Sequence, residues 1–194
     1  MSGPREAFPG FDELADTDAT RAALARLRAA TGANDGPMER HCLRTRHIAA
    51  RLAADRGWTI DGEVLTVAAI LHDIGLYPQA SRGGVYTADG AALARELLRE
   101  HGFSAERIEL CAQAIDRHHE LRGQLAQGAE VETLRLADRV ELSTALLSYG
   151  IDRAWLRALY RSVSRRGLVG ELVREIGRAL RERPLTLPQI FRRT

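Results

Sequence analysis

The stretch AAILHDIGLYPQA, residues 68–80, places His72 and Asp73 at the end of an apolar run. Gly75 and Pro78 follow and end the helix that the run predicts. A segment this apolar is expected in the interior, where a charged side chain is costly unless another group pairs with it. The imidazole and the carboxylate therefore either satisfy each other as a structural pair or bind a cation together.

Helical periodicity continues along most of the 194 residues, whereas no useful length of chain alternates with the two-residue period of a strand. We expect about seven to eight helices from this pattern. Their approximate ranges are 18–32, 37–57, 61–72, 87–102, 104–120, 130–148, 152–166 and 169–183. The pattern predicts an all-α protein, and this length suffices for one well-buried domain.

Composition argues against several classes of partner. The chain carries 28 basic and 26 acidic residues, a net charge of +2, and excess arginine gathers in 151–194. That region has no aromatic interleaving and no known nucleic-acid motif, so we expect a solvated helix face rather than a nucleic-acid partner. No apolar run is long enough to span a membrane, and MSGPREAFPGFDELAD at the N-terminus has no signal core. We therefore expect a cytoplasmic protein without a membrane partner.

Two further polar residues lie on helical stripes that are otherwise mostly apolar. The first stripe consists of Met38, His41, Thr45, Ile48 and Leu52, so His41 is expected to point into the core. The second consists of Val131, Leu134, Asp138, Leu142 and Ala145, where Asp138 is the only charged residue. An aspartate in that position needs a partner or a cation.

Three helices thus direct His41, His72, Asp73 and Asp138 towards one interior. Two neutral imidazoles and two carboxylates suit a divalent transition metal such as Zn, Mn, Fe, Co or Ni, whereas Mg or Ca favours oxygen ligands alone. The alternative is a structural network of His–Asp hydrogen bonds. Four ligand-type side chains on core faces favour the metal.

The ordered set of these motifs resembles the HD-domain superfamily of metal-dependent phosphohydrolases. HCLRTRHIAARLA at 41–53 resembles the family's first-histidine helix, LHDIG at 71–75 its signature helix, and LADRVELS at 136–143 the helix with the final aspartate. The resemblance implies an HD domain at 37–148 with one metal bound by His41, His72, Asp73 and Asp138. Residues 1–36 would form an N-terminal arm and helix. Residues 149–194 would add Arg-rich helices packed on the same domain.

Two stretches depart from the family's pattern. Some HD nucleotidases carry a glutamate three residues after the aspartate, where this chain has Leu76, which leaves the general base open. Dinuclear members carry a histidine where RGGVYTADGAA, residues 82–92, has none. His118 and His119, in AIDRHHE, match a position where the family often has a further histidine. We do not expect these residues to complete a second metal site.

The leading expectation is a metal-dependent hydrolase acting on a small phosphate ester or nucleotide through an activated water. Asp73, at the metal, would orient or deprotonate that water. His118 or His119 would protonate the leaving group or stabilise the developing charge.

An anionic small molecule is the expected substrate, and two arginines are candidates to contact it. Arg44 follows His41 by one helical turn, and Arg139 follows Asp138 directly. Each arginine is alternatively an ion-pair partner of a neighbouring acid, which would leave the pocket near neutral.

Two other functions stay open. The segments LHDIGLYPQ and YTADGAALARELLREHGF, at 71–79 and 86–103, are similar to cyanamide-hydratase-like HD proteins, which implies a hydratase or lyase acting on a small nitrogen compound. A non-catalytic signalling or scaffold domain stabilised by a metal would carry the same ligand types. A homodimer also stays open.

Overall fold

The computed structural model describes residues 8–182 and residue 184. These residues form nine α-helices and two short 3-10 helices and contain no strand. The elements are α1 (Phe11–Leu14), α2 (Asp18–Thr31), α3 (Pro37–Arg56), α4 (Gly62–Leu71), η1 (Ile74–Leu76), α5 (Tyr86–Glu100), α6 (Ala105–Arg117), η2 (Leu125–Gln127), α7 (Ala129–Leu142), α8 (Arg153–Ser162) and α9 (Leu168–Glu182). The all-α prediction is confirmed.

Local sequence signals account for several helix ends. The Thr17 hydroxyl accepts a hydrogen bond from the backbone N–H of Thr20, 3.2 Å away, and begins α2. Gly32 and Gly57 end α2 and α3 with left-handed φ angles of 68° and 65°, which glycine adopts without a Cβ penalty. Pro37 occupies the first turn of α3, where its missing N–H leaves no bond unmade.

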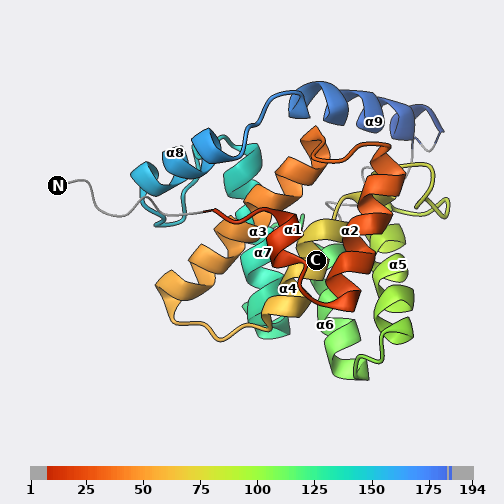
Figure 1. Cartoon of the computed structure of the whole chain (residues 1–194), viewed down its shortest axis with the longest axis horizontal. Helices are drawn as coiled ribbons and strands as arrows, with labels where there is room; N and C mark the ends of the chain where they lie inside the picture. Colours follow the sequence, from red (N-terminus) through yellow and green to blue (C-terminus); the bar gives the residue numbers. More distant parts are fainter. Residues whose placement is uncertain (1–7, 183, 185–194) are drawn as a thin grey trace.

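Helix α4 lies at the centre of the molecule. Its residues from Val64 to Leu71 are all buried, as expected for a helix that is apolar on every side. It packs against α2, α3, α5, α6 and α7. In Figure 1, α3, α4 and α7 cross the middle of the molecule, with α5 on the right, α6 below and α9 along the upper edge. The His72–Asp73 pair at the end of α4 consequently lies deep in the interior.

The helix expected at 130–148 ends earlier than its pattern indicated. Helix α7 ends at Leu142, and after Ser143 the residues Thr144 and Ala145 have left-handed φ angles of 55° and 62°. The N–H of Ala145 donates to the carbonyl of Val140 at 2.9 Å, which satisfies a carbonyl at the helix end. Leu142 is 42% exposed instead of joining the core stripe.

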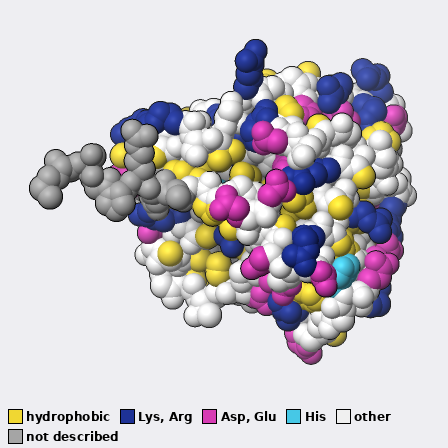
Figure 2. All heavy atoms as spheres, in the orientation of Figure 1, with side chains coloured by type: hydrophobic (Ala, Val, Ile, Leu, Met, Phe, Trp, Pro, Cys, Tyr) yellow, Lys and Arg dark blue, Asp and Glu magenta, His cyan; other side chains and the backbone are white. Residues whose placement is uncertain are grey.

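One hydrophobic cluster runs from Phe11 in α1 to Val163 after α8. The division at 1–36, 37–148 and 149–194 stays a prediction. None of the helices in the described part of the chain is both long and apolar enough to span a membrane. Figure 2 shows basic and acidic side chains interspersed over one face of the molecule.

Candidate metal centre

The backbone around the HD dipeptide is tightly packed. His72 continues the helical conformation of α4, whereas Asp73 turns out of it with φ −106° and ψ 2°, and η1 follows. A Cβ on Gly75 would overlap the carbonyl oxygen of Tyr86, so only glycine fits there. This close approach brings the start of α5 beside the dipeptide.

The imidazoles of His41 and His72 face each other with their Nε2 atoms 3.1 Å apart. His41 Nδ1 lies 2.8 Å from a carboxylate oxygen of Glu141, and His72 Nδ1 lies 2.9 Å from the carbonyl oxygen of Ala69. Since both partners are acceptors, each Nδ1 carries a proton. In the neutral imidazoles, both Nε2 lone pairs then point at one small space. A proton or a metal ion is needed between them.

Two buried carboxylates border the same space. Asp73 Oδ2 lies 3.4 Å from His41 Nε2 and 3.5 Å from His72 Nε2. Asp138 Oδ1 lies 3.4 Å and 3.8 Å from the same two atoms. Asp138 is 1% exposed, and neither of its carboxylate oxygens has a hydrogen-bond partner among the described residues. Such an orphaned buried carboxylate fits a cation, so the four residues match the ligand types of a divalent transition metal.

A second group of candidate ligands adjoins the first and shares Asp73. Ligand atoms of Asp73, His118 and His119 lie within 4.8 Å of one another. His118 Nδ1 bonds to the Ile115 carbonyl at 2.6 Å, which directs Nε2 towards Asp73 Oδ1, 3.6 Å away. The structure therefore brings together three candidate ligands, one carboxylate and two imidazoles, where the sequence analysis did not expect a second complete site. Helix α6 ends at Arg117, and the two consecutive rings then lie 4.0 Å apart, centroid to centroid.

Tyr86 is a residue of this centre that the sequence did not indicate. Its hydroxyl is hydrogen-bonded to His119 Nε2 and lies 3.5 Å from His118 Nε2. Burial, together with the carboxylates of Asp73 and Asp138, raises the pKa of Tyr86 well above its usual value, so the phenol stays protonated at neutral pH. The only sequence signal for it was a tyrosine in the stretch where dinuclear relatives have a histidine.

Glu141 is the second such residue, and it links the centre to Arg44. Its Oε1 accepts a hydrogen bond from Arg44 Nε at 2.6 Å and from Arg165 Nε at 3.2 Å, while Oε2 faces His41. Burial raises the pKa of Glu141, but the positive charges of His41, Arg44 and Arg165 outweigh it and lower that pKa to about 2. Its sequence signal was a position one helical turn after Asp138.

Arg44 was expected to contact a substrate, but the structure gives it a different environment. The side chain is 0% exposed, and NH1 donates to the Ser164 carbonyl at 2.6 Å. Its guanidinium thus lies behind His41 in an ion pair with Glu141, where it can act on the centre through that carboxylate.

Arg139 instead lies at an opening of the centre. It lines a pocket of about 300 Å³ together with His119 and Asp138. Its NH2 donates to the carbonyl oxygen of Glu120 at 2.6 Å. The side chain is half-buried, so an anion in the pocket can approach it.

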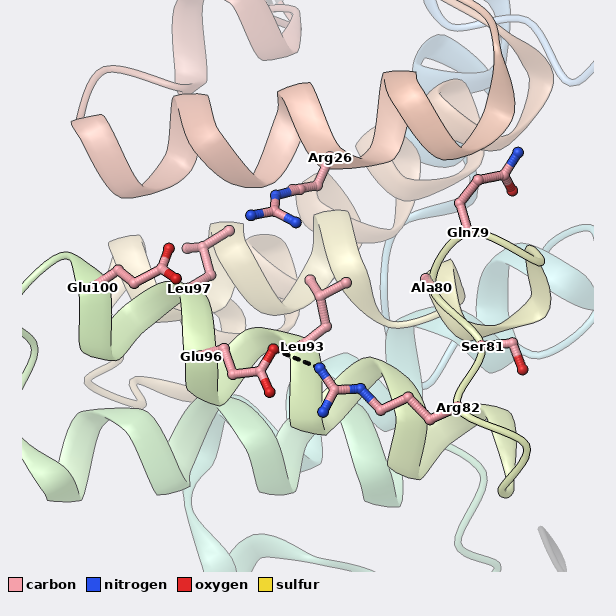
Figure 3. Close-up of a pocket in the computed structure, with 9 residues that line it drawn as sticks. All are labelled: Arg26, Gln79, Ala80, Ser81, Arg82, Leu93, Glu96, Leu97 and Glu100. Carbon is pink, nitrogen blue, oxygen red and sulfur yellow. Dashed lines mark hydrogen bonds and ion pairs between the residues drawn. The ribbon is translucent and has the colours of Figure 1, made fainter.

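A second pocket, drawn in Figure 3, lies between α2, α5 and the loop after η1. Arg26 points from α2 towards α5, and Arg82 pairs with Glu96. The pocket of about 160 Å³ has no histidine or aspartate of the two ligand groups in its lining. We therefore place the candidate active site at the histidines.

Without a bound metal, the carboxylates of the centre favour the protonated form of His41 and His72. Burial lowers the pKa of His41 and of His72, but the surrounding carboxylates outweigh it and hold both well above their usual value. Burial and the neighbouring His118 lower the pKa of His119 to about 4. Since metal ligation needs neutral imidazoles, metal binding at His41 and His72 must release protons.

Comparison with known protein families identifies a domain that includes the candidate centre. The family model described as HD domain matches residues 38–143, which is more than half of the chain. This range contains every residue of both candidate ligand groups. No protein with a curated description matches the chain.

Proposed function

The chain belongs to the HD-domain family of metal-dependent hydrolases, and on that premise we propose that it hydrolyses a small phosphate ester or nucleotide. The proposal rests on His41 and His72, whose Nε2 atoms face each other at 3.1 Å, and on the nearby carboxylate of Asp138, which has no hydrogen-bond partner among the described residues. A divalent cation satisfies all of these buried atoms at once.

In this proposal His41, His72, Asp73 and Asp138 hold one divalent transition metal, and Zn, Mn, Fe, Co and Ni all suit their atoms. When bound, the metal acidifies a water molecule and polarises the phosphoryl group. Glu141 keeps the Nδ1 atom of His41 protonated, so that Nε2 faces the centre.

In this proposal, proton transfer is carried out by Asp73, which belongs to both ligand groups, and by the histidines of the second group. Asp73 orients the attacking water and accepts its proton, since its two carboxylate oxygens face both groups. His118 returns a proton to the leaving oxygen, whereas His119, whose pKa of about 4 keeps its ring neutral near pH 7, stabilises the developing charge. The hydroxyl of Tyr86 contacts both rings and holds them at the centre.

Substrate charge favours Arg139 as the contact for the phosphate, because it lines the pocket that reaches Asp138.

A second candidate function has its own support. Because Arg44 is paired with Glu141, this pocket is less positive than two open arginines would make it. A hydratase or lyase acting on a neutral nitrogen compound suits such a pocket. In the third alternative the metal is purely structural and the protein has no catalytic activity.

A substrate panel tests these alternatives on purified, metal-loaded protein. Phosphomonoesters and nucleotides form one arm, and cyanamide and small nitriles form the other. We expect phosphate release, its loss in His72→Ala, and its retention in the matched surface variant Arg82→Gln at the second pocket. Turnover of a nitrile without phosphate release from any ester would overturn the hydrolase in favour of the hydratase. Inactivity on both arms with bound metal would favour the scaffold.

A further inference from the structure

Among the described residues, large apolar side chains that are exposed fall in two parts of the chain. One group lies along α9. The other is formed by leucines of the segment that contains the end of α6, η2 and the end of α7. Its members are Leu121, Leu125, Leu142, Leu146 and Leu147.

Three leucines of the second group line the pocket at the candidate metal centre. Leu121, Leu142 and Leu147 are 67%, 42% and 45% exposed, and they border the pocket of about 300 Å³. His119, Asp138 and Arg139 line the same pocket. It therefore combines a polar part, next to the candidate metal ligands, with an apolar part.

The backbone that carries these leucines is costly to form. Thr144 and Ala145 take left-handed angles, which disfavour residues with a Cβ. The N–H of Leu147 donates to the Ser143 hydroxyl at 3.1 Å, which holds the turn in place. Through this turn Leu147 joins Leu142 in the pocket lining. Strain next to a site is typical of a backbone that serves a function there.

We propose that the three leucines bind the alcohol part of the substrate, and that the substrates are phosphate monoesters of apolar alcohols. This inference rests on the proposed hydrolase. The phosphate would lie towards Arg139 and Asp138, and the hydrocarbon would lie on Leu121, Leu142 and Leu147. Water attacks phosphorus, the bond from phosphorus to the alcohol oxygen breaks, and a proton passes to that oxygen. The products are inorganic phosphate and the alcohol.

The leucines also select against nucleotides. A nucleoside leaving group would place ribose hydroxyls against hydrocarbon, where they lose hydrogen bonds to water. The binding affinity of an alkyl group rises about fourfold for each methylene that is fully buried. It rises roughly twofold for each methylene that stays half exposed. Discrimination should therefore grow with the length of the alkyl chain until the pocket is filled.

The test compares methyl, butyl and hexyl phosphate with a nucleoside monophosphate. We expect kcat/KM to rise roughly 30-fold from methyl to hexyl phosphate, at about twofold for each added methylene. In Leu121→Ser and Leu147→Ser, the ratio of hexyl to methyl phosphate should fall by about 3- to 10-fold. Val169→Ser, a control at an equally exposed apolar position on α9, should leave the ratio unchanged.

Calorimetric binding of methyl- and hexylphosphonate, which are not hydrolysed, separates this inference from the proposed function. Hydrolysis of all esters without chain-length dependence, or preference for the nucleotide, would overturn the apolar specificity and leave the hydrolase standing. Tighter binding of hexylphosphonate without hydrolysis of any ester would support the apolar pocket and overturn the hydrolase. Absence of both would overturn both.

Discussion

Replacing Glu141 by glutamine should weaken both the fold and the metal centre. The carboxylate accepts hydrogen bonds from His41 Nδ1 at 2.8 Å and from Arg44 Nε at 2.6 Å. An amide has one acceptor oxygen, so its NH2 group would face one of these two donors. Arg44, 0% exposed, would also lose the negative charge of its partner, and its NH2 atom already has no hydrogen-bond partner in the part of the chain that the structure describes.

The magnitude follows from these two losses. Breaking a buried ion pair costs about 3–5 kcal/mol of unfolding free energy. Removing the group that orients a ligating histidine lowers metal affinity by about 10- to 100-fold. Denaturant unfolding of metal-free protein measures the first quantity, and competition with a chelator of known affinity measures the second.

Glu132→Gln is the matched control for this experiment. Glu132 lies on the same helix, is also buried, and accepts two hydrogen bonds from Arg135 at 2.7 and 2.9 Å. We expect it to lose stability but to keep its metal affinity, since Arg135 does not contact the histidines. Folded Glu141→Gln protein with the wild-type metal affinity would refute the orienting role of Glu141.

Asp138→Asn should lose the metal at neutral pH, because the amide cannot supply the charge of the carboxylate. Element analysis of the purified variant checks this. Stoichiometric metal in Asp138→Asn and in His41→Ala would contradict the ligand set. Gly75→Ala should destabilise the protein by about 1–3 kcal/mol or more, because its Cβ overlaps the Tyr86 carbonyl, whereas Gly62→Ala meets only an arginine at 4.0 Å and should not. Stability of the metal-free protein should be highest near pH 6.5 in thermal melts, because the lowered pKa of His119 removes stability as pH falls from 6.5 towards 4. The raised pKa values of His41 and His72 contribute stability below 6.5 that is lost as pH rises through them. The lowered pKa of Glu141 contributes stability above 4.5 that is lost as pH falls towards 2. Bound metal, which keeps the imidazoles neutral, should remove the alkaline loss, and a loss of equal size with metal would contradict this reasoning.

Local pattern was enough to predict the fold class and to select His41, His72, Asp73 and Asp138 as candidate ligands, a set that stays a prediction. A helical period of apolar residues specifies which face of each helix is buried. His41 and Asp138 were found because each lies on such a face, and burial requires a polar group to have a partner. The apolar run before His72 likewise predicted that the end of α4 lies in the interior.

Contacts between distant elements decided the rest. Glu141 meets His41 across 100 positions in the chain, and Tyr86 meets His119 across 33. Periodicity gives the direction of a side chain relative to its own helix, but the packing of helices against each other selects its partner. The same holds for Leu142, whose stripe predicted burial. Helix α7 ends there in left-handed residues, and only the tertiary structure makes this leucine part of a pocket instead of the core.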